Sequence, residues 1–258
     1  MKLYLKALKL HFKSLLEYRT SLITSLIAQS IIIFSYYFVI LALFDKFGNI
    51  KGFTLYEVLL CFGIIQTGFS FNEIFARGID NFDKLIIRGD FDRILLRPKS
   101  LILQVLCSDI NFIKVARIIQ TGFILALSIS KLNITWNIYK VITLILMLIS
   151  AVCIFFSIFL FAASYCFFTV QGLEFRNLLT DGGKHMAQYP IGIFNKGFRF
   201  VFTFIIPYAF VNYYPLLYFL GKTDNVLYAF SPLIVVLFII PGIIAFYLGS
   251  KRYASVGS

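Results

Sequence analysis

Long apolar runs without charge constrain this chain more than any other feature of its sequence. Residues 20–44, 58–72, 141–173, 200–221 and 225–250 contain no Asp, Glu, Lys or Arg. A helix needs about 20 apolar residues to cross a bilayer, so each run predicts a membrane-spanning helix. Hydrophobic residues make up 60% of the chain, against roughly 45–50% in soluble domains. The expected fold class is an all-α membrane protein.

A sixth span is expected near residues 110–129, although Lys114 and Arg117 lie close to its start. Such long side chains can reach back to the membrane interface. The predicted spans are residues 20–44, 54–75, 108–130, 141–170, 198–220 and 231–250. Because they leave loops of ordinary length, residues 1–258 are expected to form a single transmembrane domain.

The basic residues are distributed unevenly between alternate connecting segments. Residues 1–21, 76–117, 171–200 and 251–258 together hold 19 Lys and Arg, whereas residues 45–54, 131–140 and 221–232 hold five. Lys and Arg concentrate in cytoplasmic loops of membrane proteins, so both termini are expected in the cytoplasm. The net charge of +12 is therefore interpreted as a topology signal and not as a sign of nucleic-acid binding.

The first 19 residues are expected to form an interfacial amphipathic helix. On a helical wheel its lysines fall within about 60° of one another, and its apolar residues occupy a separate face. The lysines are Lys2, Lys6, Lys9 and Lys13, and the apolar residues are Leu5, Leu8, Phe12, Leu15 and Leu16. The following apolar run is too long for a signal peptide, so an uncleaved first span is expected.

Several kinds of chemistry find no support in the sequence. His11 and His185 have no Cys, His or carboxylate partner at metal-ligand spacing, so no metal site is expected. The phosphate-loop pattern G-x-x-x-x-G-K-[ST] is not present, so no ATPase site and no cofactor are expected in this chain. The cysteines Cys61, Cys107, Cys153 and Cys166 all lie in apolar stretches and are interpreted as free thiols.

Polar residues within the spans are mostly neutral. Glu57 and Glu73 flank the second span and are expected among lipid headgroups, with a gating role for Glu73 as the alternative. Neutral polar side chains within a membrane either hydrogen-bond between helices or line a substrate path. The candidates for a path or interface are Gln66, Ser70, Gln120 and Asn212.

The segment between the second and third spans is the most charged part of the chain. Ile79, Phe82 and Ile86 recur with helical spacing, Gly89 can end that helix, and Pro98 stops the next. We expect a short amphipathic helix at the cytoplasmic surface, the alternative being a solvated loop. The side chains expected to face water are Asp83, Lys84, Arg88, Asp92, Arg93 and Arg97.

The fifth span contains Pro207 and Pro215, so a straight helix is not expected there. We predict a break, with part of residues 207–220 re-entering from the outer face and Asn212 satisfying freed backbone groups. The alternative is an ordinary span with a proline kink.

The sequence of residues 88–98, RGDFDRILLRP, resembles the signature of ABC-2 type transporter permeases. It is most similar to the subgroup with an Asp-Arg-x-Leu-x-Arg-Pro core in this loop, as are residues 206–215 and the pair Tyr189-Pro190. The resemblance implies that the loop is a coupling helix docking on a separate ATP-binding subunit. That subunit acts as a dimer and holds ATP and Mg²⁺.

The resemblance also implies a second permease chain, identical or a homologous sister, with export at the interface between the two. The expected location is the cell membrane, inner or plasma, of a bacterium. A stand-alone secondary carrier or channel is the main alternative, and an intramembrane enzyme or an assembly factor are others. The motif does not identify the substrate.

Overall fold

The computed structural model describes residues 2–17, 19–169 and 177–254, which contain helices and no strands. The long helices are α1 (Lys2–Glu17), α2 (Arg19–Phe47), α3 (Leu55–Phe75), α8 (Val115–Lys131), α9 (Ile138–Tyr165), α13 (Tyr208–Phe219) and α16 (Ile239–Ser250). Between α3 and α8 lie α4 (Arg77–Asp80), α5 (Phe82–Ile87), α6 (Asp90–Leu95), α7 (Leu101–Leu106) and η1 (Phe112–Lys114). After α9 come η2 (Leu178–Gly182), α11 (Gly183–Ala187), η3 (Ile191–Ile193), α12 (Lys196–Phe200), η4 (Val201–Ile205), α14 (Val226–Phe230) and α15 (Pro232–Leu237).

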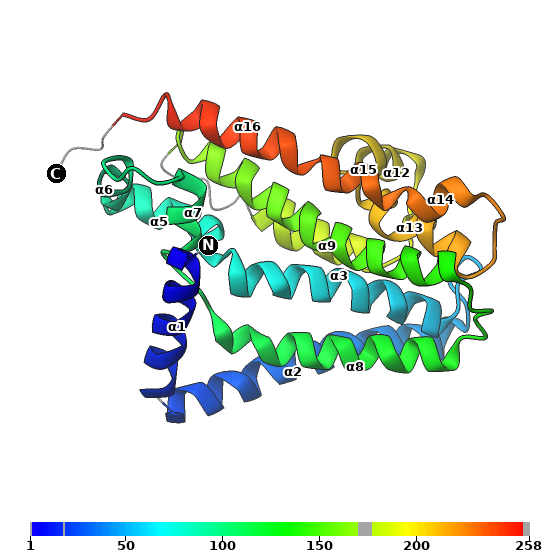
Figure 1. Ribbon diagram of the computed structural model, residues 1–258. Coiled ribbons are helices and arrows are strands. Elements are labelled where there is room, and N and C mark those ends of the chain that lie inside the picture. Colours follow the sequence, from blue (N-terminus) through cyan, green and yellow to red (C-terminus); the bar gives the residue numbers. More distant parts are fainter. Residues whose placement is uncertain (1, 18, 170–176, 255–258) are drawn as a thin grey trace.

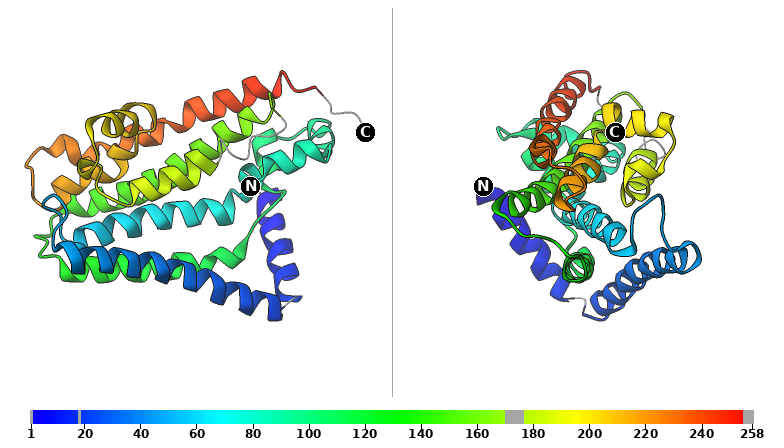
Figure 2. Two further views of the ribbon diagram at one scale, coloured as in Figure 1. Left: turned by 180° about the vertical axis from the view of Figure 1, so that it is seen from behind. Right: turned by 90° about the vertical axis from the view of Figure 1, so that its right-hand side faces the viewer.

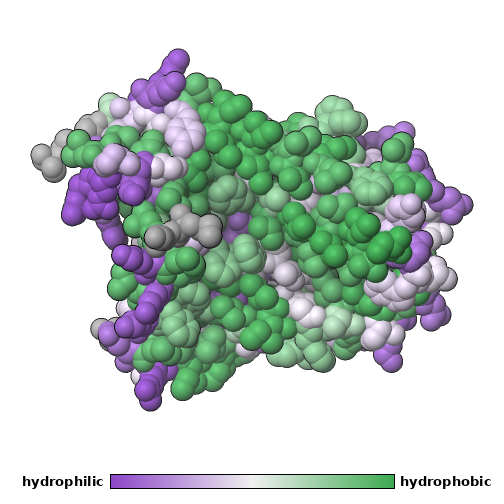
Figure 3. Space-filling model, viewed as in Figure 1, coloured by the Kyte–Doolittle hydropathy of each residue, from purple (hydrophilic) through white to green (hydrophobic). Residues whose placement is uncertain are grey.

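The long helices form an elongated bundle (Figure 1). Among the described residues, five helical segments are long and apolar enough to cross a membrane: Arg19–Phe47, Leu55–Phe75, Phe112–Lys131, Ile138–Tyr165 and Val226–Ser250. The surface shows a broad apolar belt between two polar ends (Figure 3). These features confirm the prediction of an all-α membrane protein.

The two ends of the bundle are formed by different elements. The basic end, as we call it, holds α1, α4–α7 and the last turn of α16 (Figure 1). The opposite end holds the loops at residues 48–54, 132–137 and 220–225 (Figures 1 and 2). Helix α1 lies across the basic end, at a steep angle to α2, which is the placement expected of an interfacial helix (Figure 2).

Helix α3 is the centre of the bundle, because it packs between α8 and α9. Small residues permit the close approach that helix pairs in membranes require. A Cβ on Gly63 would lie 3.0 Å from Leu125 Cβ, and one on Gly68 would lie 2.5 Å from Ala151 Cβ. Most of α3 is buried, whereas α2 packs at the edge and is mostly exposed.

Two helices begin or end several residues from their predicted limits. The third span was expected from residue 108, but the chain first forms the turn η1, and α8 begins only at Val115. Asn111 accounts for the start of η1, because its side chain accepts a hydrogen bond from Ile113 N. The fourth span was expected at 141–170, whereas α9 runs from Ile138 to Tyr165.

The predicted fifth span at 198–220 is corrected by the structure. The helical pieces Lys196–Ile205 and Tyr208–Phe219 meet at an angle of 104°, so the expected break is present. Both flanks of this pair contact the same loop at the opposite end. Lys51 Nζ donates to the carbonyl of Ile193, and Lys222 Nζ donates to the carbonyl of Gly52. Residues 196–219 therefore form a hairpin that enters and leaves at one end.

The fifth crossing is made instead by residues 178–193, which the sequence analysis placed in a loop. Thr180 and Lys184 line a cavity together with Arg77 near the basic end, while Ile193 contacts Lys51 at the opposite end. This crossing is polar, and it is covered by protein because α3 and α13 pack against α11. Placing Lys196 and Arg199 at the opposite end changes the two charge counts to 17 and seven.

Candidate functional site

The predicted coupling segment is a pair of short helices at the basic end. Helix α5 ends at Ile87 and α6 begins at Asp90, with Gly89 between them at φ +69°. A left-handed backbone costs little only at glycine, so Gly89 allows the sharp turn that separates the helices. The break expected from the sequence at this residue is present.

Five of the six predicted coupling residues reach the surface. The side chains of Lys84, Arg88, Arg93 and Arg97 are exposed, and Asp92 is half-buried. We call these five residues the coupling surface. The nearest carboxylate to Arg93 is that of Asp90, whose Oδ1 lies 3.8 Å from Arg93 Nη1. This ion pair is exposed, so it restrains the Arg93 side chain only weakly.

The prediction that Asp83 faces water is wrong. Its side chain is 5% exposed, because it points into the protein from the first turn of α5. Leu95 is 41% exposed, and its neighbour Leu96 is 86% exposed. The helical spacing of this segment did not show how α6 is oriented relative to α5 after the turn at Gly89.

An aromatic hub lies beneath the coupling surface. We give this name to Phe82, Phe91, Phe167, Phe246 and Tyr253. Ring centroids of Phe82 lie 5.1 Å from Phe91, 5.0 Å from Phe167 and 5.4 Å from Phe246. Phe91 also lies 5.0 Å from Tyr253. Edge-to-face contacts of this kind are favourable, so α5 and α6 are fixed to the ends of α9 and α16.

The coupling segment is also fixed to the chain that leads into α8. The amide of Gly78 donates to the Asp109 carbonyl over 3.1 Å, and Asn81 Nδ2 donates to the Asp109 carboxylate over 2.8 Å. A Cβ on Gly78 would lie only 1.9 Å from the Val105 carbonyl oxygen. Helices α4 and α7 therefore approach each other so closely that only glycine fits at position 78.

A buried ion cluster joins α3, α4 and α8. Its members are Glu73, Arg77, Asp80, Lys114 and Arg117. Arg117 donates to the Glu73 carboxylate, and Lys114 Nζ lies 3.2 Å from it. Arg77 lies 3.8 Å from Glu73 and 2.6 Å from Asp80. Buried charges are stable only when paired, so this cluster requires all its partners.

The cluster corrects two expectations. Glu73 is 6% exposed and Arg117 is 8% exposed, so neither lies among lipid headgroups. Lys114 does not reach back to the interface either, because its ammonium contacts Glu73 and Gln29. Sequence reasoning missed the pairing, although Lys114 and Arg117 are three residues apart and share a helix face.

Helix α1 is attached where α3 ends. The Tyr4 hydroxyl donates to the Phe75 carbonyl over 2.7 Å, and the ring of Phe12 packs against Phe112. Partial burial, with a smaller contribution from Cys107, raises the pKa of Tyr4 to about 12. The phenol therefore stays protonated at physiological pH and keeps its donor role.

The opposite end has a smaller ionic contact. Glu57 caps the first turn of α3 by accepting from the Thr54 amide, and Lys222 Nζ donates to the same carboxylate over 2.8 Å. Lys222 also lies 4.3 Å from the centre of the Phe53 ring. Like Glu73, Glu57 is buried and paired, which corrects the expectation that it lies among headgroups.

The four predicted pathway or interface residues do not gather at one place. Gln66 and Ser70 lie on α3 and are buried. Gln120 is half-buried on α8. Asn212 is buried on α13 and donates to the Ala187 carbonyl over 2.6 Å, so it joins the hairpin to the fifth crossing.

Gln66 lines a polar cavity of about 440 Å³ between α2, α3, α8 and the fifth crossing. Ile33 and Tyr36 of α2 form one wall. Glu73 and Arg117 of the ion cluster form part of another. Because Gln66 stands near the middle of α3, the cavity reaches from the basic end toward the centre of the bundle.

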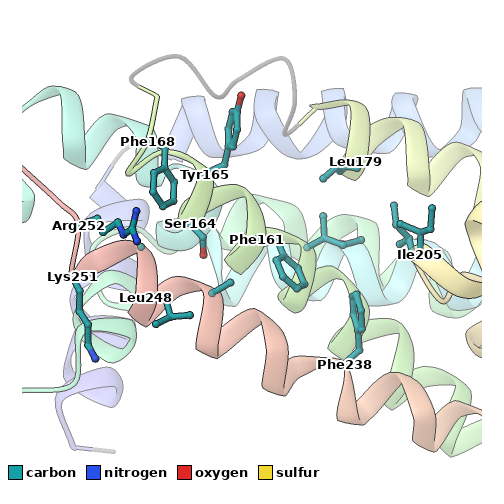
Figure 4. Close-up of a pocket in the computed structure, with 14 residues that line it drawn as sticks. Phe161, Ser164, Tyr165, Phe168, Leu179, Ile205, Phe238, Leu248, Lys251 and Arg252 are labelled. Atoms are coloured by element: carbon teal, nitrogen blue, oxygen red, sulfur yellow. The ribbon is translucent and has the colours of Figure 1, made fainter.

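An apolar groove of about 890 Å³ lies between α9 and α16 (Figure 4). Its wall contains Phe161, Phe238 and Leu248, with Ile205 at one end and Lys251 and Arg252 at the other. Such a lining has few polar groups that could orient a hydrophilic solute.

Within the described residues, no group of three His, Cys, Asp and Glu side chains is placed to hold a metal ion. None of the four cysteines is joined in a disulfide bond, which agrees with the expectation from the sequence. Burial raises the pKa of Cys107, so its thiol is not an activated nucleophile.

A comparison with protein-family models agrees with the family to which the sequence is similar. The family model described as ABC-2 family transporter protein matches residues 30–257, which is most of the chain. No curated protein and no solved structure was found to match it. The chain therefore belongs to the ABC-2 transporter family, whose members are the membrane-embedded permease components of ABC transporters.

Proposed function

We propose that this chain is the permease subunit of an ATP-binding cassette exporter and moves its substrate outward at the interface of two permease chains. The second chain is either identical or a homologous sister. A separate pair of ATP-binding subunits holds ATP and Mg²⁺ and hydrolyses the nucleotide. The chain itself binds no cofactor.

The observation that carries this proposal is the arrangement of the coupling surface over the aromatic hub. Lys84, Arg88 and Arg93 are exposed on α5 and α6. Phe82 and Phe91 on the same helices are fully packed inside. A docked subunit would thus contact polar groups on an element that is firmly attached to the bundle.

Three sets of contacts can transmit a movement of α5 and α6 to the membrane-spanning helices. The aromatic hub connects it to α9 and α16, the short helix α4 connects it to α3, and Asp109 connects it toward α8. Close-packed interiors are stiff, so a displacement is passed on instead of being absorbed. The coupling segment can therefore act as a lever.

Orientation follows from the charge asymmetry. With 17 basic residues in the segments assigned to the basic end and seven in the others, the basic end is expected to face the cytoplasm. Both termini and the coupling surface then lie where an ATP-binding subunit is available. The expected location is the inner or plasma membrane of a bacterial cell.

A stand-alone secondary carrier or channel remains the alternative. Ion-coupled carriers use an intramembrane carboxylate that binds or relays the coupling ion. Glu57 and Glu73 are the buried span carboxylates among the described residues, and both are held in ion pairs. This pairing favours the ATP-driven mechanism.

The test is to co-express the chain with a candidate ATP-binding subunit, sought first among the genes that adjoin its own, and to reconstitute both in liposomes. The two proteins should purify together in equal amounts, and the hydrolysis rate per ATP-binding subunit should change severalfold on reconstitution. An ATP-binding subunit with an inactivated catalytic site should abolish transport. Transport by the chain alone would instead identify a carrier or channel.

A further inference from the structure

The polar cavity beside α3 contains hydrogen-bond donors that the protein leaves without acceptors. Gln66 is 1% exposed, and its Nε2 has no hydrogen-bond partner among the described residues. The same holds for Nε of Arg117, which is 8% exposed. Both side chains line the cavity. Buried polar groups are almost always paired, so two unpaired donors around one cavity indicate that something else supplies the acceptors.

The charges around the cavity have the matching sign. Among the described residues that line or adjoin it, four cations accompany three carboxylates. The cations are Arg77, Lys114, Arg117 and Lys184, and the carboxylates are Glu73, Asp80 and Asp181. An excess of buried positive charge is unfavourable unless an anion neutralises it.

The pairing within the cavity leaves this excess near Gln66. The carboxylates of Glu73 and Asp80 are shared by Arg117, Lys114 and Arg77, so two negative groups accompany three positive ones. Lys184 pairs with Asp181 and lies 4.1 Å from the centre of the Phe69 ring. The carboxylates of Glu73 and Asp181 are thus already paired and do not neutralise the remaining positive charge.

Part of the remaining wall is apolar. Ile32 and Ile33 of α2 and the ring of Phe69 face the same cavity. This wall suits the apolar part of an amphiphile whose charged group lies beside Arg117.

We propose that this cavity binds an anionic oxygen group, a carboxylate or a phosphate, of the molecule that the transporter moves. Gln66 Nε2 and Arg117 Nε donate to the anionic oxygens, and the excess positive charge neutralises them. The statement that this ligand is the transported molecule rests on the proposed function. The binding itself is independent of any ATP-binding subunit.

The experiment measures the thermal unfolding midpoint of the full-length chain, purified in a neutral maltoside detergent, against ligand concentration. Three probes are used: inorganic phosphate, dodecyl phosphate and laurate. The unmodified chain should show a saturable rise of the midpoint with at least one of them, because a ligand that binds only the folded state stabilises it.

Two variants test the donor. Gln66→Leu removes an amide that has no partner for its Nε2, so the fold without ligand should be retained. Gln66→Glu keeps the shape and replaces the donor with a negative charge. Each should raise the probe concentration for half-maximal effect at least tenfold. Gln120→Leu is the matched control, because Gln120 also has an unpartnered amide atom but lies outside the cavity lining.

The outcomes separate the sources of the ligand. A response to inorganic phosphate that Gln66→Leu abolishes supports binding of a soluble anion, and a response only to dodecyl phosphate or laurate supports an amphiphile. The inference is overturned if no probe shifts the midpoint, or if both Gln66 variants respond like the unmodified chain. Gln66-dependent binding without ATP-dependent transport would overturn the proposed function and leave the anion site standing.

Discussion

Glu73 is the residue on which the basic half of the bundle depends most. It lies in the last turn of α3 and contacts cations from α4, η1 and α8. A buried charge that loses its partner is destabilising by about 3–5 kcal/mol, more than the pair itself contributes. The cluster therefore fixes how three elements meet instead of adding greatly to stability.

Replacing Glu73→Gln is expected to lower the free energy of unfolding by about 3–5 kcal/mol, because it leaves Lys114 and Arg117 buried without a carboxylate. Thermal unfolding in detergent measures the effect. Adding Arg117→Gln should recover part of the loss, because it removes one of the stranded charges. If Glu73→Gln unfolds like the unmodified chain, the cluster is not a structural requirement.

Single residues were the hardest features to predict from the sequence. Lys114 and Arg117 were expected to reach for the interface because charge in a span is costly. Their actual partner, Glu73, is about 40 residues away in the chain, and only the packing of α3 against α8 brings it near. Asp83 was misplaced for a similar reason, since the helical spacing within one segment does not show which other elements cover it.

At the scale of elements, the contact between α4 and α7 determines where the coupling segment sits. Gly78→Ala should destabilise the chain by about 1–3 kcal/mol, because its Cβ would lie 1.9 Å from a backbone oxygen that has little freedom to move. The unfolding midpoint measures this effect, and association with the ATP-binding subunit should weaken with it.

Gly122→Ala is the matched control. Gly122 lies inside α8 with no neighbouring atom within 4 Å of the added Cβ. Alanine is favoured over glycine within a helix by roughly 0.5–1 kcal/mol, so this variant should be as stable as the unmodified chain or more so. Equal stability of the two variants would contradict the close contact at Gly78.

The hairpin of residues 196–219 makes a prediction about sidedness. In a chain without its native cysteines, a cysteine at Asn195 and one at Asp224 should both react with an impermeant reagent from the outside. Ser100→Cys should react only from the cytoplasm. An unbroken fifth span would instead place Asn195 on the cytoplasmic side, so labelling of Asn195 from that side contradicts the hairpin.

The sequence predicted part of this element and not the rest. Pro207 and Pro215 indicated a break, because proline interrupts a helix, and the break is present. Residues 178–193 were not recognised as a crossing because Asp181, Lys184 and Gln188 make them too polar to resemble a span. Only burial against α3, α9 and α13 makes such a crossing possible.

At the scale of the whole molecule, the fold class followed directly from composition and run length. Uncharged runs of this length have few alternatives to membrane helices. The exposure of the coupling-surface residues was predictable because they lie within one short stretch of the chain. The polar cavity was not, since its walls come from α2, α3, α8 and the fifth crossing, which lie up to about 150 residues apart.

The most direct test of the whole account is charge reversal on the coupling surface. The double variant Arg88→Glu, Arg93→Glu changes two exposed side chains, so the chain should remain folded and inserted. Lys46→Glu at the opposite end is the matched control and should behave like the unmodified chain. The readouts are association with the ATP-binding subunit and ATP-dependent transport in liposomes.

We predict that the double reversal lowers affinity for the ATP-binding subunit at least tenfold, or leaves the complex intact but separates hydrolysis from transport. The physical reason is that α5 and α6 carry exposed charges and are packed, through the aromatic hub, α4 and Asp109, against the spans α3, α8, α9 and α16. Full ATP-dependent transport by the double variant would contradict the assignment of α5 and α6 as the coupling element.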